Sequence, residues 1–336
     1  ERTNLASHPE LTDAARELVH NDISANPQKY AQSEHAQALL SYAGVHRHLL
    51  DELHRIEDMG SDEEFEQTRN RLFDDMRDEL LKIVRVDAHV LDAQLLAIIL
   101  ADTPVAACQG DLMKLEATTA DYLQQSVPGF DMEAPHYWAN NVLADGVTAA
   151  DLTVSEPALI GWLHTLEAIS QLCMASARYR AAANYARRVL KAEGYPTRAA
   201  GTVLLALARL EDQDGFFALA HQLEEEIGAD ALENSPWYLL ARTILLFKTN
   251  KMRPATPALR EFATRCEGGA FFLLNPMYQT PYLPCRPEPH DPWDLSHQAV
   301  WEADGIISDT PDFAPWANAC EDVSQLAQEF ARRYGF

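Results

Sequence analysis

The most tempting candidate for a metal site is the segment HDPWDLSH, which contains His290, Asp291, Asp294 and His297. Imidazole and carboxylate groups are ligands that zinc and other divalent cations accept. Pro292 interrupts the segment, however, and no HExxH helix holds two histidines in a fixed geometry. We therefore predict neither a metal site nor a cofactor here.

Signals for other catalytic chemistry are weak. His46, His48 and His54 share one acidic segment, which favours a solvated helix face. The serines lack the G-x-S-x-G setting of a nucleophile elbow, and no glycine-rich phosphate loop is present. Five scattered cysteines, never spaced as CxxC, argue against a zinc ribbon and a disulfide framework: Cys108, Cys173, Cys266, Cys285 and Cys320. The sequence predicts no catalytic residue and makes an enzyme the less favoured class.

The charge balance argues against two classes of partner. The 336 residues include 27 Lys and Arg against 51 Asp and Glu, a formal net charge of -24. Such a chain repels phosphate backbones and anionic lipid, so we expect no nucleic acid and no membrane partner. The cysteine spacing favours a reduced, cytoplasmic protein. Because the numbered chain begins at Glu1 and not at Met, the sequence leaves open whether a signal peptide has been removed.

Helical periodicity dominates the chain, so we predict an all-α protein. In the N-terminal block, long helices are expected near 35–57, 62–86 and 88–101, the second capped by Ser61. Four segments are predicted: an acidic helical block over 1–127, with possible diverged repeats; an irregular connection over 128–154; helical repeats over 155–274; and an arm with a C-terminal capping helix over 275–336.

The arm is rich in proline and aromatic residues. Its stretch NPMYQTPYLPCRPEPHDPWD holds six prolines in twenty residues, so it cannot be helical throughout. We expect Tyr278, Tyr282 and Trp293 to pack it along the helices, and a last helix near 317–334 to close the chain.

Small residues recur at matching places in the helical region. Tyr179, Phe217 and Met252, at intervals of 38 and 35 residues, are each followed three residues later by alanine. Each is preceded by another expected helix with its own small residue, namely Ser170, Ala208 and Ala241. Small side chains let a second helix approach closely, so these three are predicted to be buried at helix–helix contacts. Ordinary helix crossing in an irregular all-α domain is the alternative.

The run from Trp237 through Leu240 and Ala241 to Ile244 resembles the tetratricopeptide repeat family, whose pattern begins W-x2-L-G-x2-Y. The resemblance covers residues 163–266, roughly a third of the chain. It departs from the family where serine or alanine replaces the glycine and where the closing proline is displaced to Pro196. The resemblance implies a right-handed α-solenoid of helix-turn-helix repeats, and in this chain the proline-rich C-terminal arm follows the repeats.

In such solenoids the first helix of each pair lines the concave surface, where partners bind. The residue directly after each small residue falls in one row across the successive first helices. The residue four positions before that one falls in an adjacent row. The predicted binding residues are therefore Gln171, Arg209 and Arg242, with Glu167, Leu205 and Tyr238. Two arginines in one row suit a carboxylate, such as that of a peptide. The alternative is that both arginines pair with neighbouring acids of the chain.

These observations favour a non-enzymatic scaffold that binds a peptide or protein segment on its concave face. Two other functions stay open. One is an enzyme, for example a metal-dependent hydrolase, with its site near the C-terminal arm. The other is a self-capped structural or regulatory protein, in which the arm itself fills the concave face.

Overall fold

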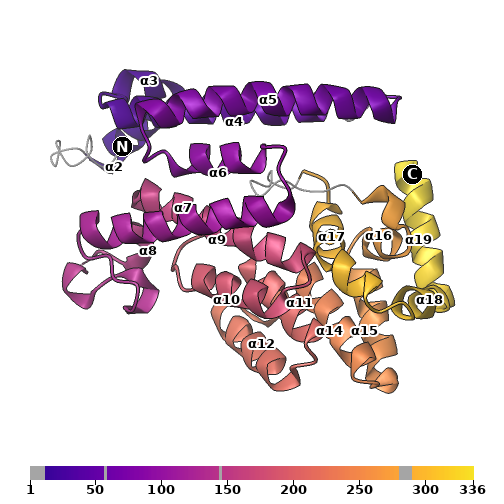
Figure 1. Ribbon diagram of the computed structural model, residues 1–336. Coiled ribbons are helices and arrows are strands. Elements are labelled where there is room, and N and C mark those ends of the chain that lie inside the picture. Colours follow the sequence, from indigo (N-terminus) through magenta and orange to yellow (C-terminus); the bar gives the residue numbers. More distant parts are fainter. Residues whose placement is uncertain (1–11, 57–58, 144–145, 280–289) are drawn as a thin grey trace. The chain divides into compact units, whose positions relative to one another are not determined.

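The computed structural model describes residues 12–56, 59–143, 146–279 and 290–336, and the regular structure in these ranges is helical (Figure 1). No β-strand occurs among the described residues, where an isolated bridge pairs Phe130 with Trp138. The all-α prediction is confirmed. The chain divides into two compact units, residues 1–119 with 157–162 and residues 120–156 with 163–336.

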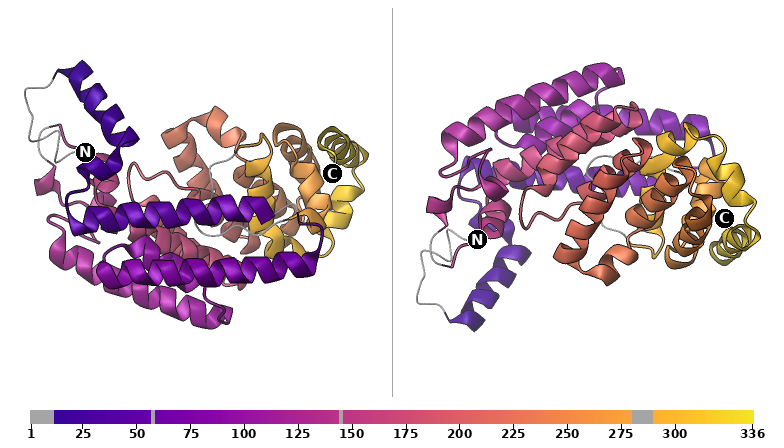
Figure 2. Two further views of the ribbon diagram at one scale, coloured as in Figure 1. Left: turned by 90° about the horizontal axis from the view of Figure 1, so that it is seen from above. Right: turned by 90° about the horizontal axis from the view of Figure 1, so that it is seen from below.

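The first unit contains an antiparallel pair of long helices that lie side by side (Figure 2). His35, at the start of one, contacts Asp87, just past the end of the other, with 2.6 Å between Nδ1 and Oδ2. Ser61 accepts a hydrogen bond from the backbone N–H of Glu64, as the predicted cap requires. The helices of this unit are α2 (Asp13–Ala25), α3 (Pro27–Tyr30), α4 (Glu34–Ile56), α5 (Asp62–Val86), α6 (Leu91–Ile99), most of α7 (Val105–Ser126) and the first residues of α9 (Pro157–Ala175).

The short apolar helix α6 supplies much of the core of the first unit. Its Leu95 and Leu96 are fully buried, and Arg77 of α5 donates from Nε to the carbonyl oxygen of Ala97 at 3.1 Å. Gly161, in the first turns of α9, approaches α6 so closely that a Cβ there would lie 2.6 Å from the Cβ of Leu91. This close approach holds the start of α9 in the first unit.

The second unit is a succession of shorter helices that runs towards α19, drawn in yellow in Figure 1. Its helices, after the end of α7 and the rest of α9, are α8 (Ala149–Ser155), α10 (Tyr179–Leu190), α11 (Ala199–Arg209), α12 (Gln213–Ile227), α13 (Ala229–Glu233), α14 (Pro236–Lys248), α15 (Met252–Arg265), α16 (Gly269–Leu274), α17 (Asp294–Ser308), α18 (Phe313–Asn318) and α19 (Glu321–Tyr334). Short 3₁₀ turns lie at Pro135–Tyr137, Asn140–Val142 and Pro276–Tyr278.

Each pair of the repeat pattern has a second helix, expected to begin at Tyr179, Phe217 or Met252. Two of these three helices begin at the expected residue. Helix α10 begins at Tyr179 and α15 at Met252. Helix α12 begins four residues before Phe217, because Asp212 caps it by accepting a hydrogen bond from the N–H of Gly215 at 3.0 Å. Helix α10 packs on α11, α11 on α14, and α14 on α15.

The C-terminal segment differs from its prediction in two respects. Helix α17 was not expected, and the expected last helix is two helices, α18 and α19, separated near Cys320. Trp293 packs against Phe272, with ring centroids 5.3 Å apart, and Tyr278 lies 5.2 Å from Phe271. The predicted packing of Tyr282 falls outside the described residues.

Candidate functional site

The small residues that the repeat pattern singled out lie at helix contacts. Ser170 is 2% exposed, and both Ala208 and Ala241 are fully buried, which confirms their predicted burial. The hydroxyl of Ser170 in α9 donates to the backbone oxygen of Ala182 in α10 at 2.9 Å, so this pair of helices is also joined by a hydrogen bond. The small side chains at these three positions therefore allow neighbouring helices to pack closely.

Helix α17 lies along α11 in a parallel register. Three polar contacts join residues that are each 100 positions apart: Arg198 with Gln298, Thr202 with Glu302, and Arg209 with Asp309. On a helix, positions 198, 202 and 209 fall within about 40° of arc, so they form one face. We call the surface formed by this face of α11 and by Trp237 of α14 the inner face. Helix α17 covers it.

A buried carboxylate anchors α17 to both inner helices. Glu302 is 7% exposed. It accepts one hydrogen bond from the hydroxyl of Thr202 in α11 and another, at 2.8 Å, from Nε1 of Trp237 in α14. The guanidinium of Arg198 lies over the Trp237 ring, 5.8 Å from its centroid. Because a buried carboxylate without donors is costly, these contacts favour a single position of α17.

Arg209 contacts the C-terminal end of α17. Its Nη2 lies 3.3 Å from Oδ2 of Asp309, and its guanidinium lies over the ring of Tyr179, 5.3 Å from the centroid. The Tyr179 hydroxyl also donates to Asp309 at 3.2 Å. Burial, followed by the nearby carboxylate of Asp309, raises the pKa of Tyr179. The carboxylate that the sequence analysis assigned to a partner is here supplied by the chain itself.

Arg242 pairs with a different acid from that of Arg209. It pairs with Glu261 of α15, and its guanidinium lies over the ring of Tyr238 at 5.4 Å. Burial acts to lower the pKa of Arg242, but hydrogen bonds to Glu261 and Tyr238 outweigh it and raise the pKa. Both arginines also have a buried Nε without a partner. The structure thus shows the pairing alternative at both positions, and no open anion site is formed there.

The remaining predicted binding residues are also not gathered into one site. Leu205 is fully buried and falls on the same face of α11 as Thr202 and Arg209, so it is not available to a partner in this structure. Glu167 accepts hydrogen bonds from the hydroxyls of Tyr195, at 3.0 Å, and Thr197. Tyr238 stacks on Phe216 of α12 at 6.0 Å, and Gln171 is half-buried. Glu167 and Tyr238 thus contact other side chains of the same chain, and the binding role predicted for the two rows stays a prediction.

The residues of the candidate metal segment serve other purposes. Asp294 begins α17, and its Oδ2 accepts hydrogen bonds from the backbone N–H groups of His290 and Asp291, at 2.8 and 3.0 Å. His297 is 3% exposed and packs 4.5 Å from the ring of Phe272. Burial lowers the pKa of His297. The backbone of Tyr278 and the carboxylate of Asp294 act in the opposite direction, but more weakly. Within the described ranges, no three His, Cys, Asp or Glu side chains gather as a metal site would require.

The residues that matter most at the inner face were missed from the sequence. Gln298, Glu302 and Asp309 all come from α17 or its end. A signal was present: Ala299, Ala303 and Ile306 repeat with helical spacing after an acidic first turn at Asp294. The proline-rich stretch before them favoured the prediction of an extended arm in place of this helix.

Comparison with known proteins finds no family model, no curated protein and no solved structure that matches this chain. In the part of the chain that the structure describes, no helix combines the length and the apolar composition needed to cross a bilayer. We therefore infer function from the geometry of the inner face and of the surfaces around it.

Proposed function

We propose that this chain is a self-capped, non-enzymatic scaffold, in which a helix of the chain itself fills the inner face. In this proposal helices α9 to α15 form tetratricopeptide-like, right-handed repeats, and α17 is a built-in cap of their inner face. The observation that carries the proposal is the parallel contact of α17 with α11, at three positions each offset by 100 residues. Helix-in-groove binding is a common way for helical repeats to hold a partner, and here the bound helix belongs to the same chain.

The burial of α17 favours a permanent cap over an open peptide groove. Eight residues of α17 are buried, among them Ala299, Val300, Ala303 and Ile306, which are fully buried. A competing peptide would have to replace this apolar contact and also provide acceptors for Thr202 and Trp237. The third of the three functions considered above, self-capping, is therefore the one that the geometry supports best.

A labelled copy of the cap tests this proposal. A fluorescent synthetic peptide with the sequence of residues 294–309 is mixed with the full chain, and its anisotropy is followed. The wild-type chain is expected not to bind it. Ala303→Asp, which places a charge in the buried face of α17, should loosen the cap and allow binding. Ala93→Asp, at an equally buried alanine in α6 of the first unit, is the matched control and should leave the inner face closed.

The outcomes separate the three functions. Binding of the peptide to the wild-type chain would show an exchangeable inner face and would replace self-capping by peptide recognition. Hydrogen exchange gives a second measure, since the amides of α17 should exchange as slowly as those of α11. Stoichiometric metal in the purified protein would instead favour the enzyme alternative.

A further inference from the structure

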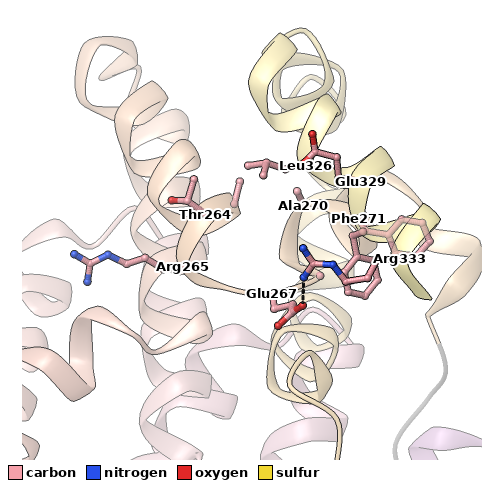
Figure 3. Close-up of a pocket in the computed structure, with 11 residues that line it drawn as sticks. Thr264, Arg265, Glu267, Ala270, Phe271, Leu326, Glu329 and Arg333 are labelled. Carbon is pink, nitrogen blue, oxygen red and sulfur yellow. Dashed lines mark hydrogen bonds and ion pairs between the residues drawn. The ribbon is translucent and has the colours of Figure 1, made fainter. Parts of the chain in front are cut away.

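A groove of about 310 Å³ lies between α15, the start of α16 and α19, within the second unit (Figure 3). In this view Leu326 projects from α19 towards Thr264 of α15. Apolar side chains on all three helices line it, namely Ala263, Ala270, Phe271, Leu326 and Phe330. Its volume is at the lower end of the range of ligand pockets, which is enough for a large side chain of a partner.

The apolar wall of the groove is held rigid by aromatic packing. The rings of Phe271 and Phe330 lie 5.2 Å apart, and both also contact Phe336, at 5.0 and 5.6 Å. Gly268, with φ of +75°, brings the backbone so close that a Cβ there would lie 3.0 Å from the Phe330 ring. A wall that is already ordered loses little conformational entropy when a partner binds.

The charges around the groove leave it negative. Arg265 points away from it in Figure 3 and pairs with Glu233 and Glu261. Arg333 pairs with Glu267 at 2.8 Å. Glu329 lines the groove and accepts a hydrogen bond from Gln325, and among the described residues no cation pairs with it.

We propose that this groove is a docking site for a protein segment that presents a bulky apolar side chain flanked by lysine or arginine. The apolar side chain enters beside Leu326 and Phe330, and the basic residue pairs with Glu329. A chain with a formal net charge of -24 attracts such a segment and repels a second copy of itself, so charge complementarity selects the basic partner. The inference rests on the proposed scaffold function, because it takes the inner face as already occupied.

The test uses a fluorescent helical peptide of leucine and lysine, about 14 residues long, with leucines on one face. Anisotropy titrations measure its affinity for the full chain. A peptide with glutamate in place of lysine, and one with serine in place of leucine, should each bind at least about tenfold more weakly. Equal binding of the glutamate peptide would overturn the charge assignment, and equal binding of the serine peptide would overturn the apolar one.

Two pairs of variants distinguish the groove from general charge attraction. Glu329→Lys should weaken binding of the lysine peptide about tenfold, whereas Glu224→Lys, the same change of charge at an exposed position of α12, should alter it less than about twofold. Leu326→Lys should also weaken binding, and Ile227→Lys at an exposed site is its control. Equal effects within either pair would show that binding follows total charge, and the proposal would be wrong.

The remaining outcomes identify a different occupant. Sedimentation of the chain alone should show no self-association. A dimer that Leu326→Lys dissolves would assign the groove to a second copy and overturn the proposal. If the lysine peptide fails to bind while the 294–309 peptide is also excluded, the docking site is lost but the self-capped scaffold is kept. If the 294–309 peptide binds and displaces the lysine peptide, the inner face is the site and both proposals fall.

Discussion

Replacing Gly201 by alanine should destabilise the second unit, although alanine is the better helix former. A Cβ at this position of α11 would lie 2.3 Å from Cγ and 2.7 Å from Cβ of Trp237 in α14. Because the Cβ of Trp237 is attached to the α14 backbone, ring rotation cannot relieve the contact. The two helices would have to separate by about 1 Å to restore ordinary contact, since interiors are close-packed.

The expected magnitude follows from three contributions. Overpacking of a core costs about 1–3 kcal/mol. Moving Trp237 weakens its hydrogen bond to Glu302, worth about 1 kcal/mol. Replacing a helical glycine by alanine returns about 0.5–1 kcal/mol. The net loss of unfolding free energy should be about 1–3 kcal/mol.

Gly305→Ala is the matched control, because it changes the same residue type in a helix of the same unit. There the nearest atoms to a new Cβ are the Tyr179 hydroxyl at 3.7 Å and the Met174 oxygen at 3.9 Å, both ordinary contacts. This variant should be as stable as wild type or more stable by up to about 1 kcal/mol. Urea unfolding followed by circular dichroism measures both. The reasoning is refuted if Gly201→Ala and Gly305→Ala shift the midpoint equally in the same direction.

Four further predictions concern buried residues. Ala208→Leu should overpack a helix crossing and lower the unfolding free energy by about 1–3 kcal/mol in urea titrations; an unchanged midpoint would contradict the assigned contact. Glu302→Ala should cost more than Glu302→Gln, by at least about 1 kcal/mol, because it leaves two buried donors without an acceptor. Burial lowers the pKa of His297 below its ordinary 6.5, so the folded state binds fewer protons there; stability should be full above pH 6.5 and fall below it, and His297→Phe should remove this fall in pH-dependent melts. Burial raises the pKa of Cys266 to about 12, so iodoacetamide at pH 8 should label this thiol, read by mass spectrometry, only after the protein is unfolded.

The parts of the fold that local signals determine could be predicted from the sequence. The start of α5 follows from the Ser61 cap, and the starts of α10 and α15 follow from the repeated pattern at Tyr179 and Met252. The burial of Ala208 and Ala241 could also be predicted, because only small residues permit two helices to cross so closely. Each of these signals is local, a cap or a small residue close to the position concerned, and the repeat adds that the pattern recurs after 38 and 35 residues.

The partners of the candidate site could not be predicted in the same way. The position of Arg209 after a small residue does turn it towards the inner face, but its acid, Asp309, lies 100 residues further along the chain. Arg242 has the same local position and yet pairs with Glu261, 19 residues away on α15. Arg209 and Arg242 thus occupy equivalent positions of the repeat pattern but pair with different acids. Which acid lies within reach depends on how helices that are distant in the sequence pack.

The 100-residue register of α11 and α17 also has a consequence for biosynthesis. Translation proceeds at about 5–20 residues per second, so the inner face of α11 emerges about 5–20 s before the helix that covers it. During that interval Leu205 and Trp237 have no cap, and their apolar surface is open to other nascent chains. A chain of this design therefore gains from a holding chaperone during synthesis, and truncation before residue 294, which removes α17 from α11 and α14 and α19 from α15 and α16, should lead to aggregation.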